Sequence, residues 1–204
     1  MNEGRRTQSG GVERKKKKMN ASKLILVRHG QTEWNKAGRL HGRSDLPLNE
    51  TGIQQTHLLS MELGASEPLD AVYSSPLFRA LQTAQIIAKN LQLPKVQENP
   101  ELMEREFGES EGKLVKDLDE DQRALLMNLG ETEEHLIERA VNALFKISAQ
   151  HPNQRVLVVS HGALIRSVMS HLTGIDQPDV ANAQVFELDP ALLANHVARQ
   201  PLWH

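Results

Sequence analysis

Two short apolar segments, far apart in the chain, each end in a histidine followed by a glycine. The first runs from Leu24 to Val27 into Arg28-His29-Gly30, and the second runs from Val156 to Val159 into Ser160-His161-Gly162. Four consecutive β-prone residues are typical of strands buried on both faces. Because ligands of open α/β sheets bind outside the carboxyl ends of the strands, the pattern predicts that the two imidazoles meet in one site.

The composition narrows the class of protein. The chain has 204 residues, of which 39% are apolar and 3% aromatic, enough for one domain with an aliphatic core. There is no cysteine, which excludes disulfides, thiolate metal sites and a cysteine nucleophile. The sequence has neither an apolar stretch of membrane-spanning length nor a secretory signal pattern. A cytoplasmic protein without membrane contacts is expected.

The charges are unevenly distributed. Residues 1–22 hold seven basic and two acidic side chains, whereas residues 23–204 hold 17 basic and 24 acidic ones. A basic tail could bind nucleic acid or an anionic surface, but it has no apolar periodicity and Met19 is a candidate alternative start. We expect a disordered tail over 1–22, a single domain over 23–204, and no nucleic-acid partner because the main body is acidic.

The rest of the chain alternates between strand and helix patterns. Strands are expected at 24–28, 70–73, 95–97, 156–159 and 184–188, helices at 53–63, 76–91, 113–129, 131–149 and 163–172, and loops at 38–52 and 101–112. Ser75 is expected to cap the helix that follows it, with Pro76 at the first helical position. Such alternation implies an α/β fold, a three-layer α/β/α sandwich around a mainly parallel sheet.

The strand and helix ends bring together groups suited to an anion. Arg28 precedes His29, and Arg79 lies in the first turn of the helix after Ser75. Guanidinium groups match phosphate oxygens, and helix N-termini near Ser75 and Ala163 would add backbone donors. The positive field would lower the pKa of a nearby imidazole and keep it neutral and nucleophilic. These residues predict phosphoryl transfer through a phosphohistidine, with no metal or other cofactor required.

The leaving oxygen of a phosphoester needs a proton. A carboxyl group beside a bound dianion is more easily held protonated, because its ionisation would bring like charges together. Glu104 is the candidate acid, and Glu101, Glu106 and Glu109 compete with it on spacing alone.

An ordered set of motifs resembles the signature of the histidine phosphatase superfamily, the phosphoglycerate mutase-like proteins. The set comprises Arg28-His29-Gly30-Gln31-Thr32-Glu33-Trp34-Asn35, the segment 38–52, Ser74-Ser75-Pro76-Leu77-Phe78-Arg79-Ala80-Leu81-Gln82-Thr83-Ala84, the loop 102–112, Gly130-Glu131-Thr132 and Ser160-His161-Gly162. The order and rough spacing of these motifs also match, so the resemblance covers residues 23 to about 190.

The resemblance implies a role for each matched residue. It implies that His29 is the phosphorylated nucleophile, that Glu104 is the proton donor, and that His161 acts beside them. Further implied roles are phosphate binding by Arg28, Arg79, Asn35 and the backbone at Gly42, and substrate contact or support by Gln31, Thr32, His41 and Gly162. His41 departs from the family pattern, in which glutamine or threonine is more usual, and it either touches the substrate or caps its loop.

Three functions remain open at this point. A short, acidic lid inserted at about residues 105–130 should admit water, which favours a phosphatase acting on a small-molecule phosphoester. The alternatives are a cofactor-dependent phosphoglycerate mutase and a regulator that recognises protein phosphohistidine, for which the basic tail is the only support. An exposed last strand would allow a homodimer.

Overall fold

A single mixed sheet forms the centre of the molecule. The computed structural model describes residues 22–199. Its strands are β1 (Lys23–Arg28), β2 (Ala71–Ser74), β3 (Gln97–Glu98), β4 (Arg155–Ser160) and β5 (Val185–Leu188), in the order β3-β2-β4-β1-β5. The first four strands run parallel, and β5 pairs antiparallel with β1 at one edge. The mainly parallel sheet predicted from the sequence is therefore confirmed.

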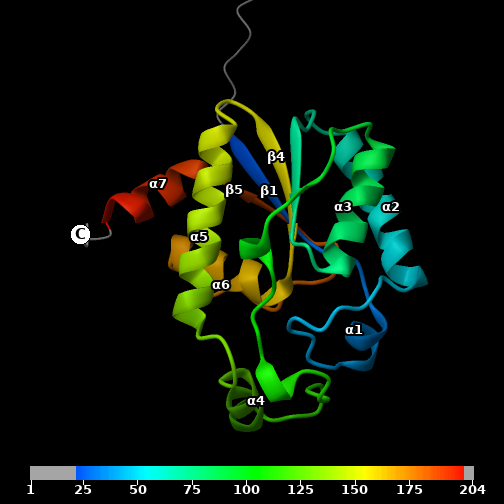
Figure 1. The fold of residues 1–204 in the computed structure, drawn as a ribbon, viewed down its shortest axis with the longest axis vertical. Coiled ribbons are helices and arrows are strands. Elements are labelled where there is room, and N and C mark those ends of the chain that lie inside the picture. The colour runs from blue at the N-terminus through cyan, green and yellow to red at the C-terminus, as the bar shows by residue number, and fades with distance from the viewer. Residues whose placement is uncertain (1–21, 200–204) are drawn as a thin grey trace, which may run out of the picture.

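Helices cover both faces of the sheet (Figure 1). The helices α2 (Glu50–Gly64) and α3 (Phe78–Asn90) pack on one face, and α5 (Glu133–Gln150), α6 (Gly162–Thr173) and α7 (Pro190–Arg199) pack on the other. The short elements α1 (Glu33–Ala37), η1 (Pro100–Leu102), η2 (Gly108–Ser110) and α4 (Glu120–Met127) lie in the connections. The predicted three-layer α/β/α sandwich is confirmed.

The alternation of β1 side chains divides the core in two. Leu24 and Leu26 belong to the cluster under α5 and α6, and Ile25 and Val27 belong to the cluster under α2 and α3. Successive side chains of a strand point to opposite faces, so a strand covered on both sides must be apolar throughout. Burial of each such side chain contributes about 1.5–3 kcal/mol, which fixes β1 and the histidine that follows it.

Helix α3 begins two residues later than predicted. Ser75 continues the line of β2, because its N–H donates to the carbonyl of Val159, and its hydroxyl accepts from the N–H of Leu77. Leu77 is the cap residue of α3 and makes no side-chain capping bond. Extension of the sheet thus keeps Ser75 and Pro76 out of the helix.

Other boundaries also differ from the expectations. Helix α2 begins at Glu50, because the Asn49 side chain accepts from the N–H of Gly52. The helix expected at 113–129 is reduced to α4, because residues 113–115 instead pair with residues 38–40. Helices α1 and α7 were not expected. Among the described residues no helix is long and apolar enough to cross a membrane, and the tail expected at 1–22 lies outside the described residues except for Ser22.

Candidate active site

The adjacent strands β1 and β4 bring the two histidines together. Arg28 lies opposite Ser160 in the parallel register, and the N–H of His29 donates to the Ser160 carbonyl across 3.0 Å. The ring centroids of His29 and His161 are 5.2 Å apart at an interplanar angle of 61°. Both side chains are buried, with 2% and 0% of their surface exposed. The expected meeting of the two imidazoles is confirmed.

Local hydrogen bonds orient His29. Its Nδ1–H donates to the carbonyl of Gly30 across 2.7 Å, so Nε2 carries the lone pair. Only glycine fits at position 30, because a Cβ atom there would lie 2.5 Å from the carbonyl oxygen of Gly52. The turn after β1 therefore presents a fixed tautomer of His29, with Nε2 directed to Arg79, whose Nε–H donates to it across 3.1 Å.

Burial and positive charge keep both imidazoles neutral. Burial, followed by the charges of Arg79 and Arg28, holds the pKa of His29 well below its usual value of 6.5. Burial and the charge of Arg79 likewise hold the pKa of His161 well below 6.5. A neutral imidazole with a free electron pair is a competent nucleophile, whereas an imidazolium is not.

Arg79 is fixed by the loop that follows α1. Its Nη1 donates to the carbonyl of Ser44 across 2.9 Å, and its Nη2 donates to the carbonyl of Gly42 across 2.8 Å. Burial lowers the pKa of Arg79 to about 10, against the opposing charges of Glu104 and Asp45. The guanidinium is therefore cationic at neutral pH, although it is fully buried.

Two buried polar atoms beside His29 lack hydrogen-bond partners. They are Nε of Arg28 and Nδ1 of His161. Their side chains are otherwise anchored: Nη1 of Arg28 donates to the carbonyl of Val180, and Nε2 of His161 lies 2.8 Å from Oγ of Ser75. Buried polar groups are nearly always paired, so unpaired atoms on two side chains beside one imidazole indicate a polar ligand site.

Glu104 lies at the N-terminus of α6. Its carboxylate accepts from the N–H groups of Arg105, Leu164 and Ala163 across 3.0, 3.1 and 3.2 Å. The expectation that this helix end would offer backbone donors to a bound anion is therefore wrong, because Glu104 already uses them. At α3, the N–H of Phe78 similarly donates to Asp45 across 2.6 Å.

A cavity of about 570 Å³ adjoins this site, and it is lined by Arg28 and Glu104, whereas His29, Arg79 and His161 are not among its lining residues. Its wall includes six residues that the sequence singled out, namely Arg28, Asn35, His41, Gly42, Glu104 and Gly162. It also includes charged residues that the sequence analysis did not select, namely Arg39, Arg105, Glu120, Arg123, Glu133, Arg166 and Asp179. Asp179 partly neutralises two of these arginines, because its carboxylate lies 2.9 Å from Arg166 and 3.7 Å from Arg123.

The supporting candidates separate into two groups. His41 lines the cavity, and its Nε2 lies 2.6 Å from Oγ1 of Thr32. Burial and the charge of Arg79 lower the pKa of His41 to about 3. Gln31 is not on the cavity wall; its side-chain oxygen accepts from Asn49, and its N–H donates to Gln55. Gln31 therefore joins the turn after β1 to the start of α2.

Asn35 belongs to the hydrogen-bond network of the same turn. Its side-chain oxygen accepts from the N–H of Thr32 across 3.1 Å and from the side chain of Asn182 across 3.2 Å. Asn182 also donates to the carbonyl of His29. Sequence reasoning missed Asn182 because no motif surrounds it, and only the return of the chain along β5 places it beside His29.

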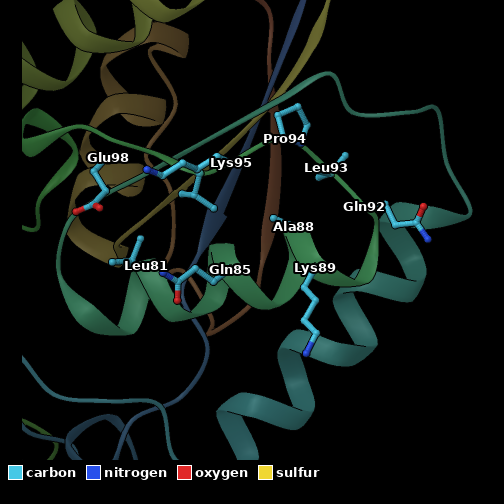
Figure 2. Close-up of a pocket in the computed structure, with 10 residues that line it drawn as sticks. Leu81, Gln85, Ala88, Lys89, Gln92, Leu93, Pro94, Lys95 and Glu98 are labelled. Atoms are coloured by element: carbon cyan, nitrogen blue, oxygen red, sulfur yellow. The ribbon is translucent and has the colours of Figure 1, made fainter.

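A second crevice, of about 430 Å³, lies between α3 and the segment before β3 (Figure 2). Its described lining includes Leu81, Ala88, Leu93, Lys89 and Lys95, with neither histidine nor arginine. Arg28, His29 and His161 lie at the carboxyl ends of β1 and β4, and Arg79 contacts His29 there, so this crevice is not the candidate active site.

Comparison with known proteins identifies the family. The model of the histidine phosphatase superfamily (branch 1) matches residues 24–194. The chain belongs to the histidine phosphatase superfamily. The resemblance seen in the sequence motifs is thereby confirmed.

Several superfamily members are similar over most of the chain. The metal-independent phosphoserine phosphatase of Arabidopsis thaliana is 37% identical over 74% of this chain and 69% of its own length. The uncharacterized phosphatase PhoE of Bacillus subtilis is 34% identical over 88% and 90%. The phosphoserine phosphatase of Entamoeba histolytica, crystallised as a mutant with phosphoserine, is 29% identical and superposes with a TM-score of 0.71 over 81% of this chain and 89% of that one. Proteins named as phosphoglycerate mutases also match.

Proposed function

We propose that this histidine phosphatase hydrolyses phosphomonoesters of small metabolites through a phosphohistidine at His29. The observation that carries the proposal is the two unpaired buried atoms, on Arg28 and His161, beside a neutral imidazole. A phosphoryl group offers three oxygens that accept hydrogen bonds. Two relatives that are named as phosphatases also support hydrolysis of a phosphate ester.

The first half of the reaction transfers the phosphoryl group to His29. Nε2 of His29 attacks phosphorus, the bond from phosphorus to the ester oxygen breaks, and protonated Glu104 gives its proton to that oxygen. The substrate leaves as an alcohol. Arg28 and Arg79 neutralise the charge that spreads over the equatorial oxygens in the transition state.

His161 has a role at the same oxygens. The hydroxyl of Ser75 accepts from the N–H of Leu77 and lies 2.8 Å from Nε2 of His161, and we propose that it donates its own proton to that nitrogen. That arrangement places the imidazole proton of His161 on Nδ1, the unpaired atom. Nδ1–H then donates to a phosphoryl oxygen.

In the second half, water attacks the phosphorus atom of phosphohistidine. The bond from phosphorus to Nε2 breaks, the Glu104 carboxylate takes a proton from the water, and inorganic phosphate leaves. The cycle restores neutral His29 and protonated Glu104. Hydrolysis needs water at the phosphoenzyme, and segment 105–130, which we propose as a small lid, allows it, because α4 has no buried residue.

Phosphoserine is the first substrate to test. Two of the relatives are named as phosphoserine phosphatases. The cavity wall also carries charged groups that suit the carboxylate and the ammonium group of an amino acid. Arg166 and Arg123 on its wall suit a carboxylate, and Glu133 and Glu120 suit an ammonium group. We therefore propose a preference for phosphoserine over phosphate esters that lack the amino group.

The proposed reaction is tested by phosphate release from phosphoserine, 3-phosphoglycerate, a sugar phosphate and a nucleotide. His29→Ala is expected to abolish both turnover and acid-labile labelling of the protein by a radioactive phosphate donor. Persistent turnover in this variant would end the assignment of His29 as nucleophile. Isomerisation of 3-phosphoglycerate, primed with its bisphosphate, that is faster than phosphate release would replace the phosphatase with a mutase.

Two further proposals concern partners. A protein-phosphohistidine regulator is the remaining alternative, and rapid turnover of small phosphoesters by a chain starting at Met19 would remove it. A homodimer formed through the edge strand β5 is tested by light scattering of the purified protein; a monomer at all concentrations would exclude it.

A further inference from the structure

We propose that Glu111 is a positioning residue that holds Arg79 at the phosphoryl site through the loop 41–44. The inference rests on the proposed function, because it assigns Arg79 to the bound phosphoryl group. Glu111 lies directly after η2, within the segment 105–130 that we propose as the lid. Glu111 and Arg79 both bind the backbone of this loop.

The carboxylate of Glu111 is saturated with donors. Its Oε1 accepts from the N–H of Arg43 across 2.8 Å and of Phe107 across 3.3 Å. Its Oε2 accepts from both the N–H and the hydroxyl of Ser44, across 2.8 and 2.6 Å. Hydrogen bonds to an ionised acceptor are roughly twice as strong as those between neutral groups, so this carboxylate is a firm anchor.

The same loop presents its carbonyl groups to Arg79. The carbonyls of Gly42 and Ser44 accept from Nη2 and Nη1 of Arg79. The loop therefore donates N–H groups to Glu111, while its carbonyl groups accept from Arg79. Displacement of the loop from Glu111 would move both carbonyls, and with them the guanidinium.

Gly42 permits this close approach. Its φ angle is +55°, and a Cβ atom there would lie 2.0 Å from Oε1 of Glu111. Backbone pairing reinforces the contact, because Leu40 donates to the carbonyl of Lys113 and accepts from the N–H of Gly112. The negative charge of Glu111 also acts on Arg79 and raises its pKa against the effect of burial.

A carboxylate is needed at this position. The donors from Arg43, Ser44 and Phe107 fall on both oxygens. A glutamine has one oxygen and one NH2 group, so its NH2 group would face a backbone N–H and could accept nothing. Glu111→Gln therefore keeps the shape of the side chain but breaks half of the anchor.

The test measures binding of inorganic phosphate and of vanadate by calorimetry, together with kcat and KM for an aryl and an alkyl phosphate. Glu111→Gln is expected to weaken binding of both anions about tenfold and to raise KM in the same proportion for both esters. Ser44→Ala, which removes one of the four hydrogen bonds, should give a smaller loss in the same direction. Glu109→Gln, an exposed change in the same segment, is the matched control and should leave all values unchanged.

The outcomes separate the inference from the proposed function. Unchanged anion binding in folded Glu111→Gln would overturn the inference, even if its melting temperature fell. If that variant does not fold, unchanged anion binding in Ser44→Ala would overturn it instead. Absence of turnover by the unmodified protein would reject the proposed function while anion binding still tests Glu111. Absence of both turnover and anion binding would reject both.

Discussion

Nε of Arg79 donates a hydrogen bond to Nε2 of His29 across 3.1 Å. The lone pair assigned to attack on phosphorus is thus held by a cationic donor. This contact makes protonation of His29 unfavourable, because a proton on Nε2 would face a positive guanidinium. A bound phosphoryl group must take over Nε–H of Arg79 before His29 can react.

The Arg79–His29 contact predicts the pH dependence of activity. His29 must be neutral to attack, and burial, Arg79 and Arg28 hold its pKa well below 6.5. In a plot of kcat/KM against pH, the fall in rate on the acid side that protonation of His29 causes should therefore lie below pH 6.5. Arg79→Gln removes a positive charge, so this acid-side fall should move to higher pH and the rate should decrease. Rates corrected for titration of the substrate phosphate test this prediction, and an acid-side fall at the same pH in Arg79→Gln would contradict it.

The buried imidazoles also predict how stability depends on pH. Their pKa values are lower in the folded protein than in the unfolded chain, so the unfolded chain binds more protons as the pH falls below 6.5. The free energy of unfolding should consequently decrease as the pH falls through that range, by about 1.4 kcal/mol per pH unit for each imidazole. His161→Gln removes one imidazole, so it should reduce this slope by about 1.4 kcal/mol per pH unit, which corresponds to one proton. Urea unfolding between pH 5 and pH 8 measures the slope, and an equal slope in the variant would reject the contribution of His161.

The sheet and the meeting of the two histidines could be predicted because the signals are local. Four apolar residues before His29 and four before Ser160 are enough to specify β1 and β4, and parallel pairing then brings both chain segments to one edge. The imidazoles lie 5.2 Å apart for this reason. The local pattern at Arg79 likewise placed it in the first turn of a helix.

The supporting contacts could not be predicted, because each joins residues far apart in the sequence. Glu111 binds the loop at Ser44, and Asn182 binds the backbone of His29. No spacing rule connects these positions. The use of the α6 N-terminus by Glu104 was missed for the same reason, since the sequence shows a free helix end but not the carboxylate that reaches it.

Glu104→Gln should affect esters according to their leaving group. An alkyl oxygen needs a proton as its bond to phosphorus breaks, whereas an aryl oxygen with a low pKa leaves without one. The variant keeps one of the two acceptor oxygens that the N–H groups of α6 use, and it cannot donate a carboxyl proton. We expect a loss of about 10²–10⁴ in kcat/KM for alkyl phosphates and a much smaller loss for p-nitrophenyl phosphate. An equal loss for both esters would indicate a structural role for Glu104.

Arg139→Lys should reproduce this pattern more weakly. Arg139 donates to the carbonyls of Glu101 and Glu104 across 2.6 and 3.2 Å and forms a two-pronged pair with Glu131. Burial opposes ionisation of Glu131, but the hydrogen bonds and charge of Arg139 prevail and lower its pKa to about 2. Lysine keeps the charge but lacks the several planar N–H donors of arginine. It therefore cannot hold the carbonyls of Glu101 and Glu104 and the Glu131 carboxylate together, and the segment that carries Glu104 should shift. Comparison of aryl and alkyl rates tests this, and anion binding should stay unchanged, in contrast to Glu111→Gln.

Gly42→Ala and Gly108→Ala form a matched pair that isolates the contact with Glu111. Both glycines have a φ angle of +55°, but a Cβ atom at Gly42 would lie 2.0 Å from Glu111, whereas at Gly108 the nearest atom is 3.9 Å away. Each change should lower the free energy of unfolding by about 1–2 kcal/mol, because alanine is strained in the left-handed backbone conformation. Only Gly42→Ala should also weaken phosphate binding, because Glu111 must leave the loop to make room for the methyl group.

The double variant with Glu111→Gln gives the decisive measurement for Gly42. If the methyl group acts by displacing the carboxylate, phosphate binding should weaken little more in the double variant than in either single one, because both changes break the same anchor. Fully additive losses of binding would show instead that Gly42→Ala perturbs the phosphate site by a route that does not involve Glu111.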